Sequence, residues 1–266
     1  MKRLITGILV ATGWLFLLLA GPPVLLQLVV TGLAALALAE YLTMVLPGSG
    51  VRLRVGLTLC GLLPLLGASF GRADLLLAGL VAALVSVLLL TVFRYTSLDD
   101  PFAIASRSSF GYLYIGLGTA HLLLLATMPQ GRHWLLLLTT ITAASDTAAY
   151  YTGTLLGRHK FHPAISPGKT WEGFAGGLVG GLLAALVVAS LFLPEPGPAG
   201  VGLVAILLGC VGAVGDLAES VIKRAFAIKD SGSLLPGHGG ILDRIDSLLL
   251  AAPTLYYLLS FYIPSW

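Results

Sequence analysis

Residues 75–93 read LLLAGLVAALVSVLLLTVF, a stretch rich in leucine, valine and alanine that contains no charged side chain. A helix of roughly 20 such residues crosses a hydrocarbon core about 30 Å thick. Similar apolar runs recur near residues 4–20, 24–46, 53–70, 75–93, 110–128, 133–151, 172–193, 200–218 and 241–263. The sequence therefore predicts an all-α, polytopic integral membrane protein with about nine transmembrane helices.

The composition excludes an ordinary soluble domain. Hydrophobic residues make up 57% of the 266-residue chain and charged residues only 10%, and the mean hydropathy is +0.97. The apolar runs are continuous and do not alternate with polar residues, so they predict helices and not the strands of a membrane barrel. We expect about five spans in residues 1–130, followed by a catalytic region, residues 131–266, with polar loops at 152–171 and 219–240.

The distribution of positive charge predicts the orientation in the membrane. If the N-terminus is cytoplasmic, all of the 15 Lys and Arg residues except Arg72 and Arg132 fall on the inner side of the predicted spans. An excess of Lys and Arg on cytoplasmic loops is typical of membrane proteins. We therefore expect a cytoplasmic N-terminus, and a functional face formed by the longer polar loops on the cytoplasmic side.

A second stretch, residues 220–246, contains most of the charged groups with potential chemistry. It reads SVIKRAFAIKDSGSLLPGHGGILDRID and lies between two apolar runs. Its cations are Lys223, Arg224, Lys229 and Arg244, and its carboxylates are Asp230, Asp243 and Asp246. So many charges beside a bilayer are typical of a site that binds an ion or a phosphate.

Acidic residues also lie within the apolar runs or at their ends. They are Asp146, Asp216 and Glu219, with Asp243 and Asp246 at the start of the last run. The i, i+3 spacing places Asp216 with Glu219, and Asp243 with Asp246, on one helix face. An acid near mid-bilayer costs about 2.5–3.5 kcal/mol, and a bound divalent cation offsets this cost. Hard oxygen ligands favour Mg²⁺; the alternative is that the acids only form ion pairs with Lys223, Arg224 or Arg244.

Residues 166–170 and the glycines near residue 238 are candidates for phosphate binding. Ser166, Lys169 and Thr170 precede a predicted helix, and a helix N-terminus attracts anions. The alternative is an ordinary basic loop with a helix cap. The flanking Gly237, Gly239 and Gly240 allow the backbone near His238 to approach a ligand closely. Glycines between residues 173 and 181 have a small-xxx-small spacing that favours close helix packing.

The motifs resemble one enzyme family, that of phosphatidate cytidylyltransferase, or CDP-diacylglycerol synthase. The matching residues are Ser220, Lys223, Arg224, Lys229, Asp230, Gly232, Pro236, His238, Gly239, Gly240, Asp243, Arg244 and Asp246, with Ser145-Asp146, 166–170, Glu172-Gly173, Gly215-Asp216 and Glu219-Ser220 upstream. The specific resemblance covers about residues 142–250. The first 140 residues resemble the family only as apolar helices.

The resemblance implies transfer of the cytidylyl group of CTP to phosphatidate by a multi-pass protein of the cell (inner) membrane, with the active site on the cytoplasmic side. The expected catalytic residues are Asp216, Lys223, His238, Asp243, Arg244 and Asp246. The expected substrate-binding residues are Ser166, Lys169, Thr170, Ser220, Arg224, Lys229, Gly239 and Gly240. The expected Mg²⁺ ligands are Asp216, Asp243 and Asp246 with Asp146, and a second metal ion fits the same site. The expected partners are CTP, phosphatidate, the bilayer and a second copy in a homodimer, and no nucleic acid.

Two other functions remain as alternatives. One is a different membrane phosphotransferase acting on lipid phosphates, although the chain lacks the longer aspartate array of the CDP-alcohol class. The other is an ion-coupled transporter, which requires acids near mid-membrane with access from both sides. The predicted acids gather at one face, and this favours the cytidylyltransferase.

Overall fold

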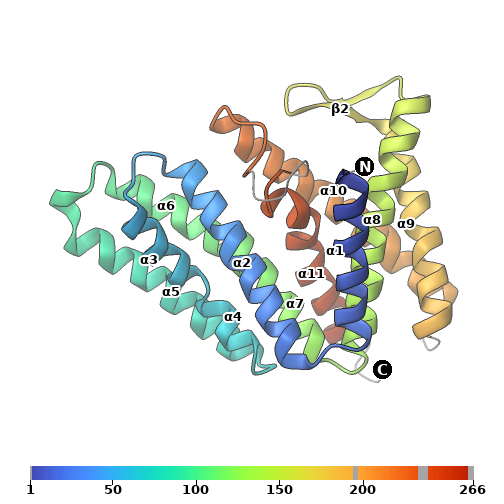
Figure 1. Cartoon of the computed structure of the whole chain (residues 1–266), viewed down its shortest axis with the longest axis horizontal. Coiled ribbons are helices and arrows are strands. Elements are labelled where there is room, and N and C mark those ends of the chain that lie inside the picture. The colour runs from blue at the N-terminus through green and yellow to red at the C-terminus, as the bar shows by residue number, and fades with distance from the viewer. Residues whose placement is uncertain (1, 194–196, 233–238, 263–266) are drawn as a thin grey trace. The chain divides into compact units, whose positions relative to one another are not determined.

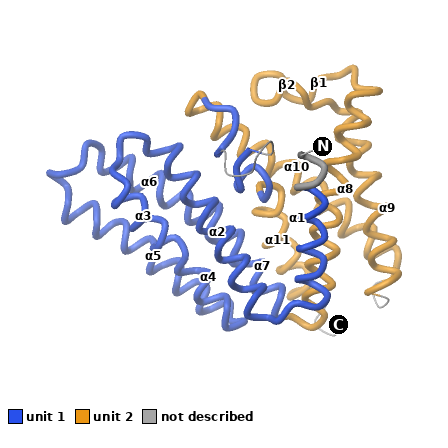
Figure 2. The backbone as a smooth tube through the Cα atoms, in the orientation of Figure 1, with its two compact units in different colours: residues 1–127, 228–245 blue, residues 128–227, 246–266 orange. Residues whose placement is uncertain are grey.

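The computed structural model describes residues 2–193, 197–232 and 239–262 (Figure 1). Helices dominate it, and the described residues contain one short β-hairpin in addition. The chain forms two compact units, coloured separately in Figure 2. Unit 1 comprises residues 1–127 and 228–245, and unit 2 comprises residues 128–227 and 246–266. The charged segment 228–245 thus belongs to the same unit as the N-terminal helices.

Unit 1 is built from apolar helices joined by short turns. They are α1 (Lys2–Leu19), α2 (Pro23–Val45), α3 (Val51–Gly61), α4 (Leu63–Ala68), α5 (Ala73–Phe93), η1 (Tyr95–Ser97), α6 (Pro101–Gly111), η2 (Tyr112–Gly116) and α7 (Leu117–Thr127). Proline at the first position starts α2 and α6, where its missing N–H costs no hydrogen bond. Asp100 also caps α6 by accepting a hydrogen bond from the backbone N–H of Ala103.

Glycines bring helices of unit 1 into backbone contact. A Cβ on Gly67 of α4 would lie 2.1 Å from the carbonyl oxygen of Leu75, and one on Gly79 of α5 would lie 2.4 Å from that of Leu63. Any larger residue at these positions would force α4 and α5 apart. A Cβ on Gly61 of α3 would meet the ring of Tyr112, whose hydroxyl donates to the carbonyl of Leu57 at 2.8 Å.

Unit 2 contains three long helices, the hairpin and most of the last helix. They are α8 (Gly131–Leu156), β1 (Lys160–His162), β2 (Ser166–Thr170), α9 (Trp171–Phe192), α10 (Pro198–Ala225) and α11 (Leu242–Tyr262), which begins in unit 1 and continues in unit 2 from Asp246. The strands are antiparallel, with Lys160 opposite Thr170. The glycine face of α9 packs on α8, because a Cβ on Gly180 would lie 2.4 Å from Cβ of Ala148. The prediction that these glycines serve close helix packing is confirmed.

Six helical stretches of the described residues are long and apolar enough to cross a membrane. They are Pro23–Val45, Val51–Ala68, Ala73–Phe93, Pro101–Thr127, Trp171–Phe192 and Pro198–Ala225. On α5, residues such as Leu77 and Val81 are 52% and 59% exposed although they are apolar, which is typical of a lipid-facing surface. The chain is therefore a helical, multi-pass membrane protein. The other three predicted spans coincide with α1, α8 and α11, which are helical.

Candidate functional site

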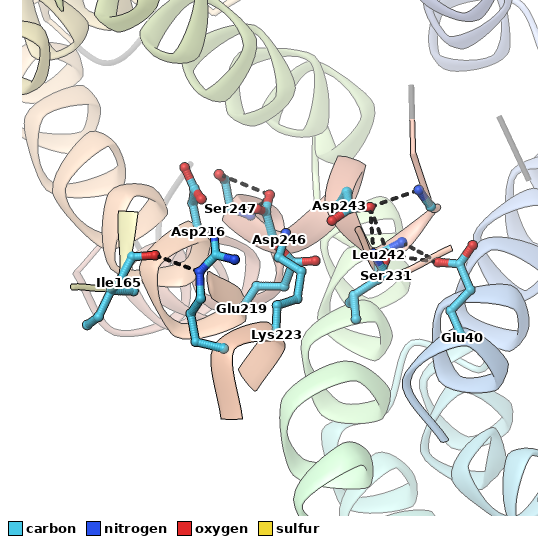
Figure 3. Close-up of polar contacts among 12 residues, drawn as sticks. Glu40, Ile165, Asp216, Glu219, Lys223, Ser231, Leu242, Asp243, Asp246 and Ser247 are labelled. Atoms are coloured by element: carbon cyan, nitrogen blue, oxygen red, sulfur yellow. Dashed lines mark hydrogen bonds and ion pairs between the residues drawn. The ribbon is translucent and has the colours of Figure 1, made fainter. Parts of the chain in front are cut away.

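Three carboxylates from three helices of unit 2 lie close enough to interact. Asp146 is on α8, Asp216 on α10 and Asp246 on α11. Asp246 is only 8% exposed, and it is repelled by Asp216 and Asp146 and attracted by Lys223. Its Oδ1 accepts hydrogen bonds from the backbone N–H of Ser247 at 2.6 Å and from the Ser247 hydroxyl at 3.3 Å. Figure 3 shows Asp216 and Asp246 with Glu219 and Lys223.

Small residues of α10 allow this convergence. A Cβ on Gly215 would lie 2.6 Å from the carbonyl oxygen of Asp246, so α10 and α11 touch through their backbones next to Asp216. A Cβ on Gly212, one turn earlier, would lie 3.6 Å from Cβ of Ser247 and 3.8 Å from Cγ2 of Thr142 on α8. The glycines thus place α8, α10 and α11 around one cluster of acids.

Two lysines provide countercharges to the acids of α10. Nζ of Lys169 lies 2.6 Å from Oδ2 of Asp216, and both side chains are about 30% exposed. Nζ of Lys223 lies 2.5 Å from Oε2 of Glu219, one turn away on the same helix. Glu219 is 1% exposed, so its charge is stabilised by this partner and not by water. The ion-pair alternative therefore describes Glu219 well.

The hairpin contacts α10 through Lys169 and Arg224. Lys169 lies on β2, and Nε of Arg224 donates to the backbone carbonyl of Ile165 at 3.2 Å. Thr170 is buried, and its hydroxyl accepts from the backbone N–H of Gly173 at 3.1 Å. This caps α9, so the helix-cap alternative holds for Thr170.

His159, in the loop before the hairpin, is paired with an acid from the start of α9. Nδ1 of His159 lies 2.6 Å from Oε1 of Glu172, and Oε2 of Glu172 accepts from the backbone N–H groups of Arg158 and His159 at 3.1 and 3.2 Å. The hairpin folds the start of α9 back onto residues 158–159, and this brings Glu172 to His159. Glu172 thereby holds the hairpin against the helix that carries it.

Asp243 organises the segment before α11 within unit 1. Its Oδ2 accepts from the backbone N–H of Gly240 at 2.8 Å, and from the backbone N–H and the hydroxyl of Ser231, each at 3.0 Å. Gly239 has a φ of +78°, and a Cβ there would lie 2.8 Å from the same oxygen. Glycine is therefore required at position 239 by both conformation and space.

The remaining predicted site residues vary in exposure. Ser220 is half-buried on α10, Ser166 is half-buried on β2, and Lys229 and Arg244 are exposed. His238 lies outside the described residues. Asp243 and Asp246 are one turn apart on α11, as their spacing predicts.

The carboxylates of Asp146, Asp216 and Asp246 are ligands that a hard divalent cation prefers, although the described side chains do not form a metal-ligating arrangement. Among the residues that the structure describes, no three His, Cys, Asp or Glu side chains are placed to hold one ion. Asp216 and Asp146 nevertheless repel Asp246, which is buried. Oxygen ligands in this number match Mg²⁺ chemistry. The residues present therefore fit the predicted ion in kind and in charge.

The sequence motifs missed one buried carboxylate, that of Glu40 on α2. It is 8% exposed, and it accepts hydrogen bonds from the backbone N–H groups of Ile241 and Leu242 at 3.0 Å each. Figure 3 shows it beside Ser231. An acid in the middle of an apolar run was the available signal, since charged residues in membrane spans are usually functional.

One family model and several known proteins are similar to this chain. The model described as the cytidylyltransferase family matches residues 1–262. A phosphatidate cytidylyltransferase of Bacillus subtilis (strain 168) is 35% identical over 274 residues, covering 98% of each chain. The phosphatidate cytidylyltransferase of Brucella suis biovar 1 is 42% identical over 186 residues, which cover 70% of this chain and 66% of its own. That of Staphylococcus saprophyticus is 39% identical over 196 residues, which cover 70% of each chain. The similarity extends to the first 140 residues, where the motifs had indicated only apolar helices.

Proposed function

Because the chain belongs to the cytidylyltransferase family, we propose that it is a phosphatidate cytidylyltransferase, which transfers the cytidylyl group of CTP to phosphatidate. The products are CDP-diacylglycerol and pyrophosphate, and the reaction serves phospholipid synthesis. The match to the Bacillus subtilis enzyme over 98% of both chains carries this conclusion. The family resemblance of the motif at 220–246 is confirmed.

The reaction needs positioning and charge neutralisation more than a strong base. A phosphate oxygen of phosphatidate forms a bond to the α-phosphorus of CTP, and the bond from that phosphorus to the oxygen of the β-phosphate breaks. The nucleophile is already an anion, and the leaving group departs as pyrophosphate. In phosphoryl transfer of this kind, cations that neutralise the phosphates supply most of the catalysis.

The basic side chains around α10 are proposed to bind the phosphates. Lys169 lies on β2 and pairs with Asp216, and Lys223 and Arg224 lie in the last turn of α10, where Lys223 pairs with Glu219. Lys229, Arg244 and His238 complete the proposed set from the motif. Ser166, Thr170, Ser220, Gly239 and Gly240 are proposed to contribute hydroxyl groups, backbone amides or space for close approach. The contacts of the hairpin with α10 support this proposal, because they bring residues of both elements together.

We assign Mg²⁺ binding to Asp216, Asp246 and Asp146 of unit 2, together with Asp243, one helical turn before Asp246. When bound, the ion would neutralise the phosphates and polarise the bond that breaks, and a second ion would share this task. Support comes from the buried position of Asp246 and its repulsion by two other acids. Lys169 and Lys223 would adjust the charge of the cluster and contact the phosphates.

The orientation and assembly complete the proposal. The asymmetry of Lys and Arg supports a cytoplasmic N-terminus, about nine spans and an active site at the inner face of the cell membrane. A homodimer is proposed from the family resemblance alone, because the glycine face of α9 is occupied by α8 within the chain. Site-directed labelling from each side of the membrane tests the orientation, and mass measurement in nanodiscs tests the dimer.

The function is tested with purified protein, Mg²⁺, radiolabelled CTP and phosphatidate. We expect a labelled lipid and pyrophosphate in equal amounts, and loss of both when a chelator removes the metal.

Asp243→Asn and Asp246→Asn should each lower turnover at least about 100-fold while the protein remains folded. Asp74→Asn is the matched control, since Asp74 is exposed and pairs only locally with Arg72. Near-normal rates in both site variants would refute the metal assignment, and absence of labelled lipid from the unaltered protein would refute the function.

A further inference from the structure

Glu40 is a buried acid in a helix that is otherwise apolar over most of its length. Helix α2 is one of the six membrane-crossing stretches, and Glu40 lies next to Tyr41 in it, with 8% and 2% of their surfaces exposed. Ionisable residues inside membrane helices are expensive and are usually retained for function. None of the roles proposed above uses this one.

Among the described residues, the hydrogen-bond partners of Glu40 belong to the segment that precedes and starts α11. Its Oε1 accepts from the backbone N–H of Ile241 and its Oε2 from that of Leu242, at 3.0 Å each. Its Oε2 also lies 3.2 Å from the hydroxyl of Ser231. The first N–H groups of a helix have no partner within the helix, so a carboxylate there satisfies them and favours the helix dipole. Glu40 therefore acts as a cap supplied by a distant helix.

Two glycines of the motif lie directly against this carboxylate. A Cβ on Gly232 would lie 2.4 Å from Oε1 of Glu40, and one on Gly240 would lie 2.5 Å from Oε2 of Glu40 and 2.2 Å from the Ser231 hydroxyl. Real Cβ atoms do not approach so closely, so a larger residue at either position requires the Glu40 side chain or the segment to shift. The motif thus contains glycines whose partner is an acid about 190–200 residues earlier in the chain.

Ser231 connects Glu40 to the proposed site. Its hydroxyl lies 3.2 Å from Oε2 of Glu40 and 3.0 Å from Oδ2 of Asp243, so its one proton is placed between two carboxylates. Asp243 also accepts hydrogen bonds from the backbone N–H groups of Ser231 and Gly240, two residues that lie against Glu40. Figure 3 shows this chain of contacts from Glu40 through Ser231 to Asp243.

We propose that Glu40 is a positioning residue, which fixes residues 231–232 and 240–242 and thereby the orientation of the Asp243 carboxylate. The catalytic part of this inference rests on the proposed function, while the contact itself does not. Glu40 acts through other residues, since its carboxylate is engaged by the start of α11 and by Ser231. Loss of the interaction would leave the fold of α2 intact and would displace a group used in the reaction.

The contact is tested by hydrogen exchange of the full chain in nanodiscs. Glu40→Gln keeps the size of the side chain but replaces one acceptor oxygen with a donor, and Glu40→Ala removes both. Both variants should exchange about 10–100-fold faster in peptides that contain the Ile241 and Leu242 amides, the range expected for losing hydrogen bonds to a charged group. Tyr41→Phe is the matched control, because it removes a part-buried hydrogen bond of 2.9 Å from the neighbouring residue to the Arg107 carbonyl. Exchange as slow as in the unaltered protein would overturn the proposal.

The catalytic consequence is tested by separating kcat from KM. Glu40→Gln should lower kcat about 10–100-fold and change the KM for CTP less than about threefold, because a misplaced group affects the reacting geometry more than binding. Tyr41→Phe should retain kcat. Faster exchange with unchanged kcat would refute positioning, although the contact would stand. If the unaltered protein made no labelled lipid, the proposed function would fail and the exchange result would still decide the contact.

A double-mutant cycle tests the geometry directly. In the protein that retains Glu40, Gly232→Ala should slow the reaction and speed exchange, because the added methyl meets Oε1, Cδ and Cγ of Glu40. In the Glu40→Ala variant those atoms are absent. Adding Gly232→Ala to that variant should therefore change its kcat and its exchange rate by less than about twofold. Strict additivity of the two substitutions would overturn the assigned packing.

Discussion

The ion pair between Glu219 and Lys223 leads to an asymmetric prediction about stability. The two side chains are 1% and 13% exposed, and 2.5 Å separates Nζ from Oε2, so solvent and salt screen them little. Lys223→Met leaves an uncompensated buried carboxylate, which costs about 3–5 kcal/mol. Lys223 also attracts Asp246, so its loss worsens the repulsion among the acids. Glu219→Gln should cost less, because the flexible lysine can extend its ammonium group toward water.

The assay is thermal unfolding in detergent, followed by intrinsic fluorescence or by loss of the monodisperse fraction. At about 2–4 °C per kcal/mol for a chain of this size, Lys223→Met should lower the midpoint by about 6–20 °C. The double variant Glu219→Gln/Lys223→Met should recover most of this loss, since it removes both charges. Arg72→Met is the control, because its pair with Asp74 is exposed, and its midpoint should stay unchanged. A double variant as unstable as the sum of the singles would refute the reasoning.

Two further predictions concern helix packing and capping. Gly180→Ala should destabilise the packing of α9 on α8 by about 1–3 kcal/mol, because the added methyl would lie 2.4 Å from Cβ of Ala148. Adding Ala148→Gly to the same chain should restore the unfolding midpoint. A midpoint that does not recover would contradict this contact. Thr170→Ala should cost about 0.5–2 kcal/mol by removing the cap of α9, whereas Thr170→Ser should keep it. Equal midpoints for these two Thr170 variants would show that the hydroxyl does not cap the helix.

The helices could be predicted because lipid imposes a strong requirement on length and polarity. The run at 75–93 corresponds to α5 at Ala73–Phe93, and the run at 172–193 to α9 at Trp171–Phe192. The hairpin could not be predicted, because β2 contains Pro167 and Gly168, which disfavour strands. It is held by contacts that only the fold provides, including a tilted contact between Phe161 and Trp171, with ring centroids 4.3 Å apart.

Asp216, Asp243 and Asp246 could be singled out from the sequence, because they lie within apolar runs or at their ends. Their partners were less accessible to sequence reasoning. The pairing of Lys169 with Asp216 depends on the hairpin, and the cap from Glu40 joins residues separated by 201 positions. Periodicity reports on one helix at a time, so it contains no information about which distant N–H groups a buried acid accepts from. The location of residues 228–245 in unit 1 was unpredictable for the same reason.

The cap from Glu40 has a consequence for biosynthesis. The carboxylate emerges from the ribosome 201 residues before the amide of Ile241 that it accepts from. At about 5–20 residues per second, this corresponds to a delay of about 10–40 s. During that interval α2 must enter the bilayer with its acid unsatisfied or held by a temporary partner such as water or an insertion factor. Nascent chains stopped before residue 241 should therefore expose Glu40 to carboxylate-directed reagents, and completed chains should protect it.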